Sequence, residues 1–263
     1  MNNPGYAIAS FTPHRIRTAT RLRYQQKGDD IPDQAAVDQW LAEFVRRLRH
    51  AFGERLVFVG HHGSWARGEA APDSDIDTVV VVDRIEAGDL TAFRDVVAAM
   101  PDGGRLASGV FNAVAELRAR APSELTQYFY GCHVLHGSID GVVTRPSAED
   151  FLADVRFKAL TNLMHARHYL LYPHDLSLKV HSLRYPFKEC FYALQEWVLA
   201  RDGTWYDRKD DLLAVLTDED DRAVVRAARD WRQAEADRTA RALDYVELLE
   251  RWSRSMLARL AGL

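Results

Sequence analysis

The chain has 263 residues, of which 47% are hydrophobic and 27% are charged, an ordinary composition for a globular protein. Its 38 acidic residues outnumber its 34 lysines and arginines, which gives a formal net charge of -4. A chain of this charge has no bulk attraction to nucleic acid, so we expect no nucleic-acid partner. Its two cysteines, Cys132 and Cys190, form no C-x-x-C pattern and exclude a cysteine-based zinc site and a disulfide framework.

The N-terminal residues lack the apolar core of a signal peptide, and no stretch approaches the roughly 18 apolar residues that span a bilayer. The sequence therefore predicts a cytoplasmic protein without a membrane partner. A polar lead of about thirty residues precedes the first periodic segment and receives no structural assignment.

The first part of the chain mixes helical and strand patterns. Apolar residues at three- and four-residue spacing from Val37 to Phe52 predict an amphipathic helix that Gly53 ends. Further strands are expected at 56–59, 76–82, 105–112 and 133–135, and helices at 91–100 and 123–129. This order predicts an α/β domain over residues 1–146, a small mixed sheet with flanking helices.

The second part of the chain shows only helical periodicity, from a boundary that we place near Ser147. Helices are expected at 151–171, 185–201 and 207–216, and a long helical segment at 218–260. Residues 147–263 therefore read as an all-α helical bundle domain. We expect the tryptophans and tyrosines of this part to build its core, and the charge-rich segment 218–241 to be a solvent-facing helix surface.

The most informative feature is a small-residue turn followed by two acids and an apolar run. Because alternate side chains of a strand share a face, Asp75 and Asp77 point to one side while Ile76 points into the core. Neighbouring carboxylates repel each other unless a cation lies between them. Hard oxygen ligands in pairs suit Mg²⁺ bound to a polyphosphate, so the segment predicts a metal-dependent phosphoryl-transfer site.

Gly63-Ser64, followed after nine residues by Ser74 and the pair Asp75-x-Asp77, resembles the signature of the DNA polymerase β-like nucleotidyltransferase superfamily. The resemblance implies that Gly63 and Ser64 bind the β- and γ-phosphates of ATP or another nucleoside triphosphate. It also implies that Asp75 and Asp77 are the catalytic metal ligands, holding two Mg²⁺ ions at an in-line displacement.

Two further nucleotide-binding residues are expected near this motif. Arg67 lies one helical turn beyond Ser64 and can neutralise phosphate charge. Ser74, which directly precedes the acidic pair, is the second.

The segment 185–213 is similar to the helical domains of small-molecule nucleotidyltransferases, such as the kanamycin- and streptomycin-modifying enzymes. This likeness implies that Lys188 reaches the triphosphate. For Tyr206 two interpretations stay open, a place near the base or sugar and ordinary packing of an amphipathic ring.

A third carboxylate, usual on a neighbouring strand of this superfamily, is missing from the expected third strand. Ser108 or Asn112 stands where it would be sought. Glu116, Glu124 and Asp140 are nearby alternatives, each with a simpler interpretation as a solvated residue at a helix end or turn. The identity of a general base is therefore open.

Histidines form two groups. His61 and His62 lie beside the Gly-Ser turn, and one of them must point towards the nucleotide side if the strand extends that far. The second group comprises His165, His168, His174 and His181. The spacing Arg167-x6-His174 resembles a motif of helical ribonuclease toxins, and His165 and His168, three residues apart on one helix face, offer a zinc site. The simpler alternative for these histidines is a place in an interface or core.

The sequence thus predicts an enzyme that transfers a nucleoside monophosphate, AMP from Mg·ATP, onto a hydroxyl of a small molecule. The overall acidic charge suits a polycationic, aminoglycoside-like acceptor. Two alternatives remain, a nucleotidyltransferase that modifies a partner protein and a nucleotide-binding pseudoenzyme. A homodimer also stays open.

Overall fold

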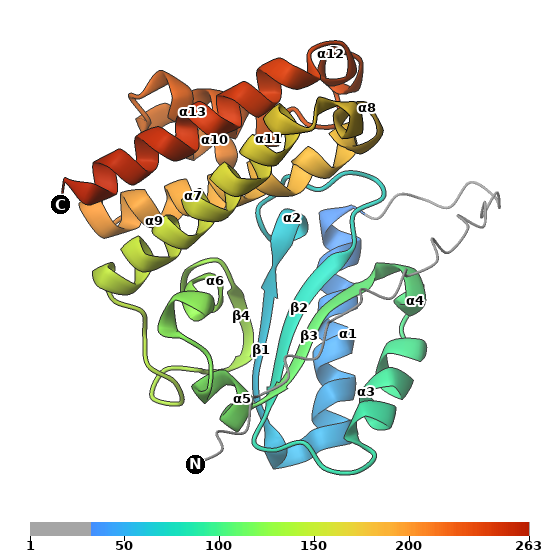
Figure 1. Cartoon of the computed structure of the whole chain (residues 1–263). Helices are drawn as coiled ribbons and strands as arrows, with labels where there is room; N and C mark the ends of the chain where they lie inside the picture. The colour runs from blue at the N-terminus through green and yellow to red at the C-terminus, as the bar shows by residue number, and fades with distance from the viewer. Residues whose placement is uncertain (1–32, 263) are drawn as a thin grey trace, which may run out of the picture. The chain divides into compact units, whose positions relative to one another are not determined.

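The computed structural model describes residues 33–262, apart from the side chains of Asp175, Ser177 and Leu178 (Figure 1). The polar N-terminal lead lies outside the described residues. None of the described helices is long and apolar enough to cross a membrane.

Helix α1, Gln34–Phe52, begins and ends where the sequence predicts. The Asp33 carboxylate accepts a hydrogen bond of 2.8 Å from the backbone N–H of Ala36, which caps the first turn. Gly53 ends the helix with a φ of 55°. The buried residues of α1, from Val37 to Phe52, face the sheet and leave the arginines in solvent.

The sheet has the strand order β3-β2-β1-β4. Its strands are β1 Leu56–His62, β2 Ile76–Val82, β3 Ala107–Ala113 and β4 His133–Gly137. β1 is antiparallel to both β2 and β4, whereas β3 runs parallel to β2, so the sheet is mixed as predicted. Figure 1 shows α1 and α3 (Asp89–Ala98) together on one face of the sheet.

The alternation of side chains along β2 decides which way the acidic pair points. Ile76, Val80 and Val82 belong to the core beneath α1 and α3. Val79 and Val81 belong to a separate core on the opposite face. Asp75 and Asp77 have the same parity as these two valines, so they lie on the face away from α1.

Short helices in the α/β part differ from the prediction. α2 (Gly63–Ala66) and α6 (Thr126–Tyr130) fall within expected segments, whereas α4 (Gly103–Leu106) and α5 (Val114–Arg118) were not predicted. Four or five residues are too few to show a helical period. β1 continues three residues past the predicted end, to His62, and this extension decides the position of the Gly-Ser turn.

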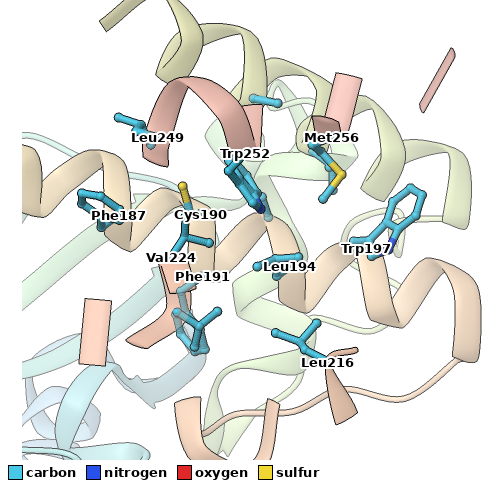
Figure 2. Close-up of a cluster of buried hydrophobic side chains, with 14 of the residues drawn as sticks. Phe187, Cys190, Phe191, Leu194, Trp197, Leu216, Val224, Leu249, Trp252 and Met256 are labelled. Atoms are coloured by element: carbon cyan, nitrogen blue, oxygen red, sulfur yellow. The ribbon is translucent and has the colours of Figure 1, made fainter. Parts of the chain in front are cut away.

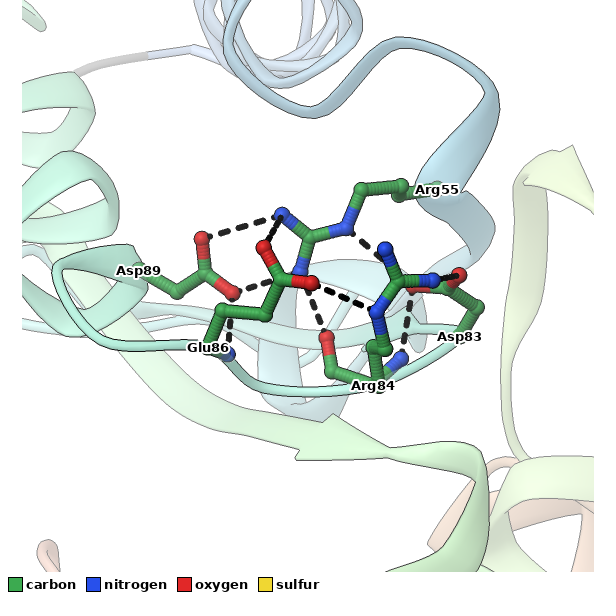
Figure 3. Close-up of polar contacts among 5 residues, drawn as sticks. All are labelled: Arg55, Asp83, Arg84, Glu86 and Asp89. Carbon is green, nitrogen blue, oxygen red and sulfur yellow. Dashed lines mark hydrogen bonds and ion pairs between the residues drawn. The ribbon is translucent and has the colours of Figure 1, made fainter.

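An ion-pair network fixes the end of β2 that lies away from Asp75 and Asp77 (Figure 3). Arg55 donates to Asp89 at 2.6 Å and to the backbone oxygen of Arg84 at 2.7 Å, and contacts Asp83 at 3.2 Å. Hydrogen bonds from Arg55 hold the pKa of Asp89 below its usual value. The network ties the loop between β2 and α3 to the start of β1.

The helical part begins where Ser147 caps α7. Its helices are α7 Ala148–Leu171, α8 Leu176–Lys179, α9 Arg184–Asp202, α10 Lys209–Val215, α11 Glu219–Arg229, α12 Glu235–Ala240 and α13 Ala242–Ala261. Figure 2 shows α9 at the centre of their core, with Phe187, Phe191 and Leu194 pointing into it. Trp252 of α13 is fully buried there, so the expected aromatic core is present.

The segment 218–260 forms three helices where the sequence pattern suggested one long run. The chain leaves the helical path after Arg229 because Trp231 turns inward and is buried. The Arg238 guanidinium lies 4.1 Å from the Trp231 ring centre, which stabilises the break. Part of the charge-rich segment is therefore buried rather than solvent-facing.

Asp221 is a buried acceptor whose removal should destabilise the bundle. Its carboxylate is 3% exposed and accepts hydrogen bonds from Trp252 Nε1 at 2.8 Å and from two nitrogens of Arg259. Asp221→Ala should lower the free energy of unfolding by about 4 kcal/mol, because it leaves a half-buried guanidinium unpaired. Denaturant unfolding measures this. Asp220→Asn, which removes an exposed pair with Arg251, should cost under about 1 kcal/mol; equal costs would contradict the assignment.

A second cluster of buried polar side chains joins α7 and α9. Lys158 Nζ donates to Asp154 at 2.6 Å and to both oxygens of Glu196 at 3.0 Å. Glu196 is 1% exposed, and burial raises its pKa to about 8 although Lys158 opposes the shift. At neutral pH the ion pair is therefore Lys158 with Asp154, and Glu196 is the protonated partner.

Because the folded-state pKa of Glu196 lies above its unfolded value, its contribution to stability is complete at low pH and is lost as the pH rises to about 8. The free energy of unfolding should fall by about 1 kcal/mol per pH unit across this window, and Glu196→Gln should flatten the profile. Denaturant unfolding at a series of pH values tests this. Glu149→Gln, an exposed change on α7, should leave the slope unchanged, and a slope that survives in Glu196→Gln would refute the prediction.

Candidate active site

The Gly-Ser turn lies where β1 ends against the start of β2. His62, the last residue of β1, pairs with Asp77 of β2, so Gly63 lies directly beside the Asp77 carboxylate. Gly63 has a φ of 83°, and a Cβ at this position would overlap that carboxylate. Glycine is required here both by the backbone conformation and by the close approach.

A cavity of about 660 Å³ opens at this turn, between the α/β part and helices α9, α10 and α11. It is lined by every site residue that the sequence predicted: Gly63, Ser64, Arg67, Ser74, Asp75, Asp77 and Lys188. The sequence placed six of these residues within fifteen positions. The fold adds Lys188 from α9, more than a hundred residues away along the chain.

Asp75 and Asp77 are uncommitted carboxylates. Asp75 is exposed and Asp77 is half-buried. Within residues 33–262 neither carboxylate accepts a hydrogen bond or forms an ion pair. The acids elsewhere in this cavity, Glu69 and Asp73, each have a cationic partner.

This donor set fits a magnesium ion shared with a substrate. Mg²⁺ is typically held by one or two carboxylates and completes its octahedron with phosphate oxygens and water. Among the described residues no three His, Cys, Asp or Glu side chains are grouped to hold a metal. Asp75 and Asp77 could therefore hold Mg²⁺ together with a polyphosphate.

Three cations, which we call the cation cluster, lie on the turn side of the cavity: Arg67, Lys188 and Lys209. The Arg67 guanidinium and the Lys209 ammonium lie 5.9 Å and 4.8 Å from the centre of the Phe191 ring. Lys188 lies 5.5 Å from the ring centre of Tyr192. Because Arg67 directly follows α2 and the two lysines come from α9 and α10, the cluster exists only when the two parts of the chain pack together.

The loop between α2 and β2 is braced from both sides. The Ser74 hydroxyl accepts a hydrogen bond of 2.9 Å from the backbone N–H of Ala71, and the Ser74 carbonyl accepts one from Trp65 Nε1. Asp73 forms an ion pair with Arg232 of the bundle. Ser74 thus lines the cavity as predicted, with its hydroxyl already holding the loop.

The register of β3 explains where a third carboxylate is missing. Ser108 pairs directly with Asp77, so it occupies the neighbouring-strand position on the same face. Asn112 pairs with Val81, about 13 Å farther along the strand, and is too distant from the site. Of these two residues, only Ser108 occupies the position beside Asp77 where a third carboxylate would be expected.

The other acidic alternatives do not line the cavity. Each has a partner elsewhere: Glu116 accepts from the backbone N–H of Ala113, Glu124 pairs with Arg120, and Asp140 pairs with Arg145. All three lie at a short helix or a turn, the position that the simpler interpretation gave them.

The two histidines beside the turn lie on opposite faces, as strand alternation requires. His62 lines the cavity with the acidic pair, and burial lowers its pKa although Asp77 and Asp75 oppose the shift. His61 is buried and lines a second cavity of about 1030 Å³ behind the turn. Tyr206 lines that second cavity, as Arg67 does, and packs against the bundle core.

The histidines of α7 stand apart from both cavities. His165 and His168 are exposed, and the His168 ring packs against Tyr169 and Tyr172. The described residues group no further metal-ligating side chains with them.

Sequence reasoning missed several residues of the cavity, all contributed by long-range packing. Lys209 lies in the segment 185–213, which the sequence analysis compared with helical nucleotidyltransferase domains. It is the first residue of α10. Glu69 had no signal, because its partner lies 140 residues away. The bundle contributes a further cationic and aromatic group: Arg184, Tyr185, Arg229, Trp231 and Arg232.

Comparison with known protein families identifies a domain in the part of the chain that holds the Gly-Ser turn. Residues 41–128, about a third of the chain, match the family model of the nucleotidyltransferase domain. That range contains the Gly-Ser turn, the acidic pair and β3. No curated protein sequence matches the chain significantly.

Among solved structures, the chain is similar to spectinomycin adenyltransferase from Enterococcus faecialis, determined with ATP and spectinomycin. The two share 12% sequence identity over 82% of this chain and 99% of the other, with a TM-score of 0.49.

The family match covers the segment in which β1, the Gly-Ser turn and β2 bring Gly63 against Asp77. The prediction of an enzyme of this class is confirmed. Residues 41–128 match the nucleotidyltransferase domain, so the predicted resemblance to nucleotidyltransferases is confirmed over this part of the chain.

Proposed function

We propose that the chain transfers AMP from Mg·ATP onto a hydroxyl of a small molecule. The observation that carries this proposal is the pair of uncommitted carboxylates, Asp75 and Asp77, in one cavity with the cation cluster. A polyphosphate needs cations along its length, and a metal at its reacting phosphorus needs oxygen ligands. The cavity offers both. We also propose that residues 1–146 and 147–263 act as two domains that enclose the substrates.

In this proposal each group of residues has one task. Arg67, Lys188 and Lys209 bind the β- and γ-phosphates beside the Gly-Ser turn and stabilise the departing pyrophosphate. Mg²⁺ bound to Asp75 and Asp77 would neutralise charge at the α-phosphate. The acceptor oxygen forms a bond to the α-phosphorus as the bond from that phosphorus to the bridging oxygen of the pyrophosphate breaks. Pyrophosphate leaves, and the proton of the acceptor hydroxyl passes to solvent water.

The acceptor side of the reaction lies towards β3. An in-line displacement places the nucleophile opposite the leaving pyrophosphate. The pyrophosphate lies at the turn after β1, so the acceptor enters from the side of β3, where Ser108 adjoins Asp77. Ser108 can accept or donate a hydrogen bond to the acceptor hydroxyl but is no base at neutral pH.

A cavity of about 660 Å³ is of the size that small-molecule sites have. Aminoglycoside-like compounds are the first acceptors to test, because the net negative charge of the chain suits a polycationic acceptor. Because Arg184 and Arg232 also line the cavity, hydroxyl compounds that carry phosphate or carboxylate belong in the same panel.

Mass spectrometry of this panel after incubation with the full chain, Mg²⁺ and each nucleoside triphosphate tests the proposal. We expect one small molecule to gain a single AMP, and the double variant Asp75→Asn/Asp77→Asn to give no product. AMP on a protein would indicate the protein-modifying alternative. Nucleotide binding without any transfer would indicate the pseudoenzyme.

A further inference from the structure

Glu69 is a carboxylate placed inside a group of cations. It follows α2 and lies on the loop that leads to the acidic pair. Its carboxylate accepts a hydrogen bond of 2.7 Å from the backbone N–H of Lys209, forms an ion pair with the Lys209 ammonium, and contacts Arg67 Nε at 3.2 Å. One carboxylate thus holds two members of the cation cluster.

These contacts are shielded from water. The side chains of Arg67, Lys209 and Glu69 are 11%, 14% and 17% exposed. An ion pair this buried is screened far less than one on the surface, so its removal has a large electrostatic effect.

Glu69 favours the charged form of Lys209 against burial and two neighbouring cations. Burial disfavours the ammonium, and Arg67 and Lys188 repel it, so the pKa of Lys209 lies below its usual value. Phe191 covers the ammonium on the α9 side without adding a formal charge. Without Glu69, the nearby charges named here would all favour the neutral amine.

We infer that Glu69 is a positioning residue, which keeps Lys209 protonated and aligned beside Arg67 so that both present their charge to the nucleotide triphosphate. The inference rests on the proposed function, because the triphosphate is the ligand of the cation cluster. Glu69 itself does not touch the phosphates. Its negative charge would repel them, and the inference requires that fixing two cations outweighs this repulsion.

Calorimetric titration with Mg·ATP and with magnesium tripolyphosphate, between about pH 7 and about pH 9.5, tests this on the full chain. Wild-type affinity should change less across this range than the affinity of Glu69→Gln. In Glu69→Gln, Lys209 loses its proton at lower pH, so the affinity for both ligands should fall by about tenfold across the range. A purely structural role for Glu69 would produce no such pH dependence.

Two variants sharpen the experiment. Glu69→Gln/Lys209→Arg carries a guanidinium that stays charged throughout, and it should restore a flat profile. Asp73→Asn removes the ion pair with Arg232 that also links this loop to the bundle, and its profile should parallel that of the wild type. If Glu69→Gln binds as the wild type does, or more tightly at every pH, the inference is wrong.

Two readouts keep the test decisive. Circular dichroism monitors the fold of each variant, and acetylation of Lys209 followed by mass spectrometry measures its protonation in the wild type and in Glu69→Gln. Acetylation of Lys209 should require a higher pH in the wild type than in Glu69→Gln; the same pH dependence in the two proteins would overturn the inference. If Mg·ATP fails to bind the wild type, the proposed function fails instead.

Discussion

Asp77→Asn is expected to reduce nucleotidyl transfer by about 10³-fold or more, and Asp75→Asn to have an effect of the same order. Both carboxylates line the cavity without a partner among the described side chains. An amide of the same shape has no negative charge and is a poor ligand for Mg²⁺. Pyrophosphate release with the acceptor found by mass spectrometry measures the loss.

The effect should be catalytic and not structural. Asp75 is exposed and Asp77 is half-buried, and neither forms an ion pair in the described part of the chain, so the melting temperatures of both variants should match the wild type. Asp95→Asn on the outer face of α3 is the matched control and should retain full activity. If Asp77→Asn transfers at the wild-type rate, the metal-ligand assignment is wrong.

Gly63→Ala is expected to abolish transfer and to destabilise the fold by about 2 kcal/mol. The new Cβ would meet a φ of 83° that L-residues rarely adopt and would overlap the Asp77 carboxylate. The turn can relax only by moving Asp77 or the start of α2. Denaturant unfolding and pyrophosphate release measure the two effects.

Gly141→Ala separates the two causes. Gly141 has a φ of 76°, and a Cβ there would meet no atom within 4 Å, so the substitution carries the backbone cost alone, about 1 kcal/mol. It should leave transfer intact. Equal activity losses in the two variants would mean that overlap with Asp77 is not what makes Gly63 necessary.

The sequence predicts strand β2 closely, for a physical reason. β2 is buried on both faces, so its unbroken run of valines can be recognised as a strand without knowing which strands pair with it. The turn and the acidic pair flank this strand in sequence. Residues that are close in sequence are therefore also close in space here, and the predicted residues line one cavity.

Residues whose position depends on distant packing were not predictable. Glu69 and Lys209 contact each other across 140 residues of sequence, so their pairing could not be seen before α10 was placed beside the turn. The break at Trp231 arises because one aromatic side chain is buried against α9, although the surrounding sequence favours a helix. Ser108 could be ranked above Asn112 only once the parallel register with β2 was known.

Calorimetric titration of the full chain with ATP, in Mg²⁺ and again in a chelator, is the most direct test of the central claim. The account predicts binding in Mg²⁺ that is lost in the chelator and in the double variant Asp75→Asn/Asp77→Asn. Absence of binding in Mg²⁺, or binding of equal strength in the chelator and in the variant, would contradict a metal-dependent nucleotide site at this cavity.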